Sequence, residues 1–281
     1  MAFCEDKNLN NHFYNLAFQK IASYSFIKTI TDQPNGTFNS GRYDVNVMMN
    51  SVYKFHNFIT AGAKKDIVST TIAVFCDSLN WTEPQEADAD IAFQRIVFKV
   101  FDKPLHSIAF HLPQGSEERH FLHPMKWHVL EKATGNVVPA HIMPMRHEEK
   151  NGVEAVYCCV FFETPLIGPD EGKEYMIETY IRHSGIMRGL KVAPYTEYLA
   201  MNNMVDETIE EVNLILMVPK PYRRSLNVTN DASCAGLAYR ELSKDDIARI
   251  SGALDNFKYN AIGCQYQNLK TGERARANFG A

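Results

Sequence analysis

Apolar and polar positions alternate along several runs in the middle of the chain, and this pattern predicts β-strands. The clearest three lie between Val153 and Pro219. Ala155–Phe162 is continuously apolar, whereas Tyr175–Arg182 and Glu211–Val218 alternate. A period of two sends successive side chains to opposite faces of a strand. We interpret these three runs as the centre of an antiparallel sheet around which the rest of the chain is organised.

Further strands are expected on both sides of this centre. The same reasoning predicts them at 91–101, 107–112, 125–131, 136–142 and 259–268. Ala133–Gly135 is expected to close a hairpin, and so is the turn at 148–152, which ends in Asn-Gly. No strand–helix–strand alternation occurs, which argues against a parallel nucleotide-binding sheet. The strand spacing indicates an immunoglobulin-like or jelly-roll-like sandwich. The β region resembles immunoglobulin-like recognition modules, a likeness that concerns the fold alone.

The pattern differs before the first of these strands. Apolar residues recur at three- and four-residue spacing from about Asn10 to about Ile30, and again from Val45 to Ile59. This spacing predicts two amphipathic helices, the second ending near Gly62. Ile67–Cys76 is short and apolar and fits either a buried helix or a strand, but its β-branched residues favour a strand.

The C-terminal part predicts one more helix. Ser243–Leu254 is amphipathic, with Ser243 as the cap and Asp246 at the third helical position. Gly272–Ala281 is expected to be a polar tail.

Asp77–Asp90 is acidic and polar, and it is the best candidate for a linker. The expected organisation is a helical region at 1–76, a linker at 77–90, a β-sandwich at 91–225, and a helix and strand at 226–281 that complete the domain. The predicted fold class is therefore α+β, with an N-terminal helical region packed against a mainly antiparallel β-sandwich.

The composition and the charge limit which cellular compartment and which class of protein we expect. Of the 281 residues, 45% are hydrophobic and 22% are charged, which is typical of a globular chain. The net charge of -4 argues against nucleic-acid binding driven by bulk charge. The first residues have no signal-peptide pattern, and no run approaches the roughly 20 apolar residues of a membrane span. We expect a soluble, cytoplasmic protein with reduced thiols.

The six cysteines do not indicate a disulfide framework or a metal site, because no pair has C-x-x-C spacing. Cys158 and Cys159 lie in an apolar run, and we interpret them as core residues. Cys234 lies among small residues in a loop, but no accompanying motif of a catalytic nucleophile is present.

Histidines cluster in the first half of the β region. They are His106, His111, His120, His123, His128, His141 and His147. Ligands two residues apart share a face of a strand, but here the local spacings are three and five. Loop histidines are therefore the favoured interpretation. A metal-dependent hydrolase that uses them stays open as an alternative, and no metal or cofactor is predicted.

Two basic turns carry the strongest functional signal. Both follow predicted strands, and together they contain Arg182, His183, Arg188, Lys220, Tyr222, Arg223 and Arg224. Arginine binds phosphate and carboxylate groups through paired N–H donors, and Tyr222 could stack on a ring. If both turns lie at the same end of the sheet, they form a cationic cluster.

The leading hypothesis is a non-enzymatic binding or assembly module. It would recognise a protein partner or an anionic, phosphate-bearing ligand through loops at one end of the sandwich, and it could form a homo-oligomer. No catalytic residue is predicted. A self-assembling, capsid-like jelly-roll protein is the remaining alternative.

Overall fold

The computed structural model describes residues 54–79, 89–110, 126–148, 154–184, 187–203, 205–222, 224–251 and 258–280. In these ranges the chain is mostly β-strand with few helices, and the strands form three sheets. The helix expected at 10–30 lies outside the described residues, as does most of the stripe at 45–59. Within the described ranges, no helix is long and apolar enough to cross a membrane.

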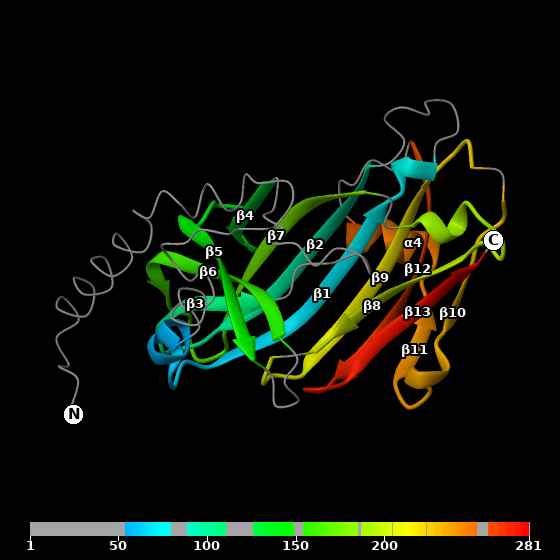
Figure 1. Ribbon diagram of the computed structural model, residues 1–281. Coiled ribbons are helices and arrows are strands. Elements are labelled where there is room, and N and C mark those ends of the chain that lie inside the picture. Colours follow the sequence, from blue (N-terminus) through cyan, green and yellow to red (C-terminus); the bar gives the residue numbers. More distant parts are fainter. Residues whose placement is uncertain are drawn as a thin grey trace, which may run out of the picture.

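The largest sheet has seven strands in the order β11-β12-β9-β1-β2-β7-β4 (Figure 1). Its strands are β11 (Ala238–Glu241), β12 (Tyr259–Leu269), β9 (Ile209–Pro219), β1 (Lys65–Phe75), β2 (Ala89–Val100), β7 (Lys173–Ser184) and β4 (Lys126–Glu131). The central pair, β1 and β9, is parallel, and the other pairs are antiparallel. The strand favoured for Ile67–Cys76 is thus confirmed as the middle strand of this sheet.

Two three-stranded antiparallel sheets lie toward opposite ends of the large sheet (Figure 1). One contains β3 (Leu105–Phe110), β6 (Glu154–Leu166) and β5 (Ala140–Glu148). The other contains β10 (Asn227–Asn230), β13 (Arg274–Gly280) and β8 (Thr196–Asn202).

Both faces of the large sheet are covered, which explains why its central strands have buried residues on both faces. Ile72 and Val74 of β1 belong to a hydrophobic core that also contains residues of both small sheets. Ala73 faces the other way and joins a second cluster with Leu242 and Ile247. Ile247 belongs to α4 (Lys244–Ser251), so this helix covers the second face.

The capping pattern predicted for α4 is confirmed. The Ser243 Oγ accepts a hydrogen bond from the Asp246 backbone N–H at 3.1 Å, and the Asp246 carboxylate accepts one from the Ser243 backbone N–H at 3.2 Å. Each side chain thus satisfies a backbone donor that the first helical turn leaves unpaired.

A second, short helix covers the sheet that contains β6. It spans residues 54–60, and Phe55 stacks on Phe161 with 5.9 Å between ring centroids. Gly62 follows it with a φ of +78°, a conformation that favours glycine at a helix end.

The three strands predicted to form one sheet centre are not neighbours. β6 belongs to a small sheet, and β1 and β2 separate β9 from β7. The segment between β6 and β7 crosses from one layer to the other, and the Gly168 N–H donates to the Phe101 carbonyl oxygen at 2.8 Å. A Cβ at Gly168 would lie 1.9 Å from the carbonyl oxygen of Val100, so this crossing requires glycine.

Two other local predictions agree only in part with the structure. The hairpin expected between 125–131 and 136–142 forms only next to its turn: Leu130 bridges Val137, and backbone hydrogen bonds join Glu131 to Asn136 and Val138 to Val129, after which β5 pairs with β6. The expected polar tail at 272–281 contains β13 instead. Its buried residues are Ala275, Ala277 and Phe279, and the two alanines are too small to give a strong alternating signal.

Candidate functional site

The turns that follow β7 and β9 lie at the same end of the large sheet. β7 and β1 both pair antiparallel with β2, and β1 is parallel to β9, so β7 and β9 run in the same direction. The Tyr222 hydroxyl donates a hydrogen bond to the backbone carbonyl oxygen of Leu190 at 3.0 Å. The two basic segments, 182–191 and 220–224, therefore meet, and we call them the cationic end.

The structure places the predicted residues of the cationic end as follows. Arg182 and His183 belong to the last part of β7, and Arg188 begins the short 3-10 helix η2 (Arg188–Leu190). The side chains of these three residues, and the whole of Arg223, lie outside the described structure. Lys220 is exposed in the turn that follows β9.

Arg224 is exposed and stacks on a tyrosine that the sequence pattern did not single out. Its guanidinium carbon lies 3.5 Å from the centroid of the Tyr195 ring. Stacking over a ring face restrains the guanidinium while the N–H donors at its edge stay available. The only sequence signal for Tyr195 is an aromatic residue directly after Pro194.

Tyr222 has a different role from the one expected of it. It is 6% exposed and packs in the main hydrophobic core, so its ring is not available to stack on a ligand. Burial raises the pKa of the Tyr222 hydroxyl, and the nearby Arg224 charge opposes this shift. The hydroxyl therefore stays protonated and donates to Leu190, which fixes the two turns to each other.

The buried carboxylate of Asp90 lies at the same end of the large sheet and fixes the turns there. Asp90 is 0% exposed, and its carboxylate accepts from the backbone N–H of Ser78 at 2.9 Å and of Met187 at 3.3 Å. Ser78 lies in the 3-10 helix η1 (Asp77–Leu79). Burial raises the Asp90 pKa, and the backbone hydrogen bonds oppose this shift. Asp90 thus connects β2 to the turns after β1 and β7.

The described histidines do not converge on a metal site. His128 Nε2 lies 2.7 Å from Glu178 Oε2, and His141 Nε2 lies 3.0 Å from Glu163 Oε1 on another sheet. In the ranges that the structure describes, no group of three or more His, Cys, Asp or Glu side chains could hold a metal ion. His111, His120 and His123 lie outside those ranges, as does the side chain of His147.

A continuous row of polar side chains crosses the large sheet on the face that α4 covers. Each member lies directly opposite the next across neighbouring strands, and we call this set the transverse polar row. Its members, in sheet order from β11 to β4, are Arg240, Gln265, Asn213, Thr71, Arg95, Glu178 and His128.

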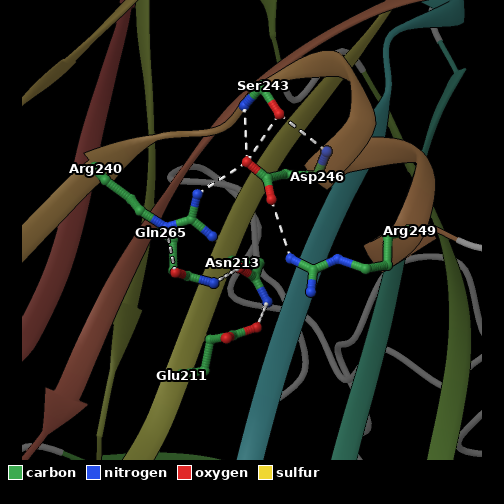
Figure 2. Close-up of polar contacts among 7 residues, drawn as sticks. All are labelled: Glu211, Asn213, Arg240, Ser243, Asp246, Arg249 and Gln265. Carbon is green, nitrogen blue, oxygen red and sulfur yellow. Dashed lines mark hydrogen bonds and ion pairs between the residues drawn. The ribbon is translucent and has the colours of Figure 1, made fainter.

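Hydrogen bonds connect the row in two segments. In the first, Arg240 Nε donates to Gln265 Oε1 at 2.7 Å, and Gln265 Nε2 donates to Asn213 Oδ1 at 3.0 Å (Figure 2). Asn213 Nδ2 reaches Thr71 Oγ1 at 3.3 Å and Glu211 Oε1 at 2.8 Å. Because Gln265 and Asn213 are 2% and 1% exposed, these bonds satisfy amides that would otherwise be costly to bury.

In the second segment Glu178 is shared by two partners. Arg95 Nε donates to Glu178 Oε1 at 2.6 Å, and His128 contacts the other carboxylate oxygen. The row also holds α4 at both ends. Arg240 Nη1 donates to Asp246 at 2.8 Å, and Arg95 Nη1 donates to the carbonyl oxygen of Ile250 at 2.8 Å (Figure 2 shows the first of these). We assign the row a structural role, since its polar atoms are used in fixing the helix and the strands.

Cysteine and histidine also meet under the short helix at 54–60. His56 Nδ1 lies 2.7 Å from Ser107 Oγ and 3.4 Å from Cys159 Sγ. Burial raises the Cys159 pKa well above its usual value and lowers the His56 pKa to about 4. Both groups are therefore neutral near pH 7, which is the opposite of what an activated thiolate requires.

The other candidate cysteines are also buried. Cys158 packs in the main core, as predicted, and burial raises its pKa. Cys234 lies in the 3-10 helix η3 (Ala232–Cys234), where its thiol contacts the carbonyl oxygen of Arg274 at 3.1 Å. None of the three buried thiols is placed to attack a substrate in solution.

Comparison with known proteins identifies no family. No protein-family model matches the chain, and no curated protein matches it. Two crystal structures are similar over 77% of this chain: "a putative protease" from Parabacteroides distasonis (TM-score 0.38, 8% identity) and "a putative nutrient binding protein" from Legionella pneumophila (TM-score 0.36, 10% identity). The matched part covers 40% of the first protein and 67% of the second. Similarity at this level carries no functional argument.

Proposed function

We propose that this protein is a binding module that recognises an anionic, phosphate-bearing ligand at the cationic end of its large sheet. The observation that carries the proposal is the hydrogen bond between the Tyr222 hydroxyl and the Leu190 carbonyl oxygen, which joins the two basic turns. Each turn alone would be an ordinary solvated loop. Held together, they place two basic stretches from distant parts of the chain side by side.

Arg224 is the residue most directly suited to contact the ligand. It is exposed, its guanidinium is restrained by Tyr195, and guanidinium edges bind phosphate oxygens through paired N–H donors. Lys220 adds a second exposed charge in the same turn region. The carboxylate of Asp90 is completely buried and engaged by backbone N–H groups, so it does not compete for these cations at the surface.

We also propose the fold arrangement, location and non-enzymatic role that the sequence predicts. The N-terminal helical region would pack on the sheets as part of an α+β sandwich, and the protein would act in the cytoplasm without catalysis. A protein partner that carries a phosphorylated or acidic segment would use the same contacts as a small ligand.

The direct test is a thermal-shift titration of the full chain with inorganic phosphate, pyrophosphate and nucleotides. A ligand at a hundred times its dissociation constant adds about 2.7 kcal/mol to the unfolding free energy. We expect stabilisation of the parent protein and a loss of at least tenfold in affinity for Lys220→Ala with Arg224→Ala.

The matched control is Arg249→Ala. Arg249 is also exposed, but it lies on α4 and pairs with Asp246 at 3.0 Å. Its variant is expected to bind as the parent does. The proposal fails if no phosphate-bearing ligand raises the melting temperature, or if the Arg249 variant loses as much affinity as the variant of the cationic end.

A further inference from the structure

The outward face of the sheet β10-β13-β8 is mainly polar and basic, and its residues are exposed or partly exposed. The inward residues of this sheet, including Leu199, Ala277 and Phe279, are buried in the main core. Alternation therefore turns the intervening residues of each strand to the solvent. The outward side chains are Thr196, Tyr198, Ala200 and Asn202 of β8, Arg274, Arg276 and Asn278 of β13, and Asn227 and Thr229 of β10.

Two arginines of this face gather around one tyrosine. The guanidinium carbon of Arg276 lies 4.1 Å from the centroid of the Tyr198 ring, and that of Arg274 lies 5.8 Å from it. Arg274 is exposed, and the Arg276 side chain is 31% exposed. Asp231 lies 3.2 Å from Arg276 Nε and neutralises part of its charge, whereas Arg274 is an exposed residue.

The stacked pair at the cationic end lies next to one end of this sheet. Tyr195 directly precedes β8, and Arg224 lies three residues before Asn227, which begins β10. Asn227 pairs with Gly280, and Gly280 pairs with Thr196, so this pair lies at the end of the sheet where β8 begins. We call Arg224, Tyr195, Tyr198, Arg276 and Arg274 the arginine–tyrosine stripe.

The length of the stripe indicates the size of its ligand. Arg274 pairs with Asn202 at the far end of β8, but its guanidinium reaches back to Tyr198. The stacked groups therefore centre on Tyr195 and Tyr198, which are three residues apart, or at most about 10 Å at roughly 3.4 Å per residue. A single phosphate contacts only one of these centres, so the surface fits a ligand with more than one phosphate.

We propose that the arginine–tyrosine stripe binds single-stranded nucleic acid. This inference rests on the proposed anion-binding function and names its class of ligand. The guanidinium edges contact successive phosphates, while the guanidinium faces turned away from the tyrosines stack on bases. The exposed amide of Asn227 on the same face adds hydrogen-bonding groups for sugars and base edges.

Aromatic stacking favours this ligand over an acidic peptide. An acidic peptide needs cations alone, but every arginine of the stripe lies over a tyrosine. Base–aromatic stacking contributes about 1–3 kcal/mol per base and does not depend on sequence. The net charge of -4 means that binding must come from this local surface, and not from the bulk charge of the protein.

The experiment is a fluorescence-anisotropy titration of the full chain with labelled oligothymidylate and oligouridylate at several salt concentrations. We expect binding that weakens with salt, with a slope of about -0.7 per phosphate contact. Arg274→Ala, at an exposed position, should raise the dissociation constant at least fivefold and reduce the slope by about 0.7. A duplex of the same length and a polyglutamate peptide should bind at least tenfold more weakly.

Two further variants test whether a loss of affinity comes from the lost arginine side chain or from unfolding. Arg276→Lys keeps a cation beside Asp231 but loses the planar stacking group, so affinity for the oligonucleotide should fall while the melting temperature is retained. Arg249→Ala removes an exposed arginine from the other face of the large sheet and should bind as the parent does. Circular dichroism confirms that each variant is folded.

The outcomes also distinguish this inference from the proposed function. Stabilisation by pyrophosphate without oligonucleotide binding overturns the inference and leaves the proposed function standing. Oligonucleotide binding that the Arg274 and Arg276 variants do not weaken also overturns it. Tighter binding of polyglutamate than of the oligonucleotide would assign the stripe to an acidic protein partner instead.

Discussion

Arg95 and Glu178 lie directly opposite each other in β2 and β7, and Arg95 Nε donates to the Glu178 carboxylate at 2.6 Å. The other oxygen of this carboxylate contacts His128 in the edge strand, and Arg95 also donates to the carbonyl oxygen at Ile250 in α4. One carboxylate thus connects its own strand, β7, to β2 and β4 and, through Arg95, to the covering helix. Polar residues in the sheet interior therefore explain how the outer elements are held.

Glu178→Gln should destabilise the protein by about 2 kcal/mol, because Arg95 and His128 would lose a charged acceptor in a largely buried place. The measurement is urea unfolding at pH 7. Glu163→Gln is the control, since its contact with His141 is exposed and should be worth less than about 1 kcal/mol. Equal effects of the two substitutions would show that the row does not carry this stability.

Gln265→Ala should cost about 2 kcal/mol, because Asn213 Oδ1 would stay buried without its donor. Gln267 offers a matched control two residues along the same strand, where the side chain is exposed. Gln267→Ala should change the free energy of unfolding by less than about 0.5 kcal/mol. Chemical denaturation measures the free energy of unfolding of both variants. A larger loss for the Gln265 variant shows that the buried amide network contributes to stability, and equal losses would contradict this.

His56 should make stability depend on pH between about 6.5 and 4. Its folded-state pKa, about 4, lies below the usual value of 6.5 because the neutral ring is buried. The unfolded chain therefore binds a proton first, and the stabilisation present above pH 6.5 is lost as the pH falls toward 4. The loss should be about 3 kcal/mol.

The check is the unfolding free energy of His56→Gln measured from pH 7 to pH 4. This variant should be less stable at pH 7 and should show a shallower decline than the parent. His141→Gln changes an exposed histidine and is the matched control variant. A parent-like decline in the His56 variant would assign the titration to another group.

Tyr222→Phe should lower both stability and ligand affinity. The lost hydrogen bond to Leu190 should cost about 1 kcal/mol, and phosphate affinity should fall several-fold because the two basic turns can separate. Tyr239→Phe removes a comparable hydroxyl bond, to the Val228 carbonyl oxygen, away from the cationic end. Its variant should lose a similar stability and retain affinity, as measured by thermal shift with pyrophosphate.

Gly168→Ala should destabilise the protein by about 2 kcal/mol, since the added Cβ would collide with the carbonyl oxygen of Val100. Gly236→Ala is the control, because no atom lies within 4 Å of the position that its Cβ would occupy. Differential scanning calorimetry compares the two. An unchanged melting temperature in the Gly168 variant would mean that the crossing between layers can move to accommodate a methyl group.

Local patterns in the sequence were sufficient to predict several elements of the fold. The apolar run at Ile67–Cys76 predicted β1, and Ser243 with Asp246 predicted the start of α4, because capping depends on residues three apart in the chain. The alternating small residues of β13 gave no comparable signal, since alanine is common in every kind of structure. The candidate site was found only in part: the basic turns could be predicted, whereas Tyr195 and the transverse polar row could not.

The sequence by itself determined that this chain is β-rich and that basic residues follow two of its strands. Only the tertiary structure decided that those two turns meet, that Tyr222 is buried between them, and that seven polar residues from seven strands form one row. The physical reason is that periodicity records which face of a strand is buried, but it does not record which strands are neighbours. Pairing and register, set by the packing of all three sheets, supply that information.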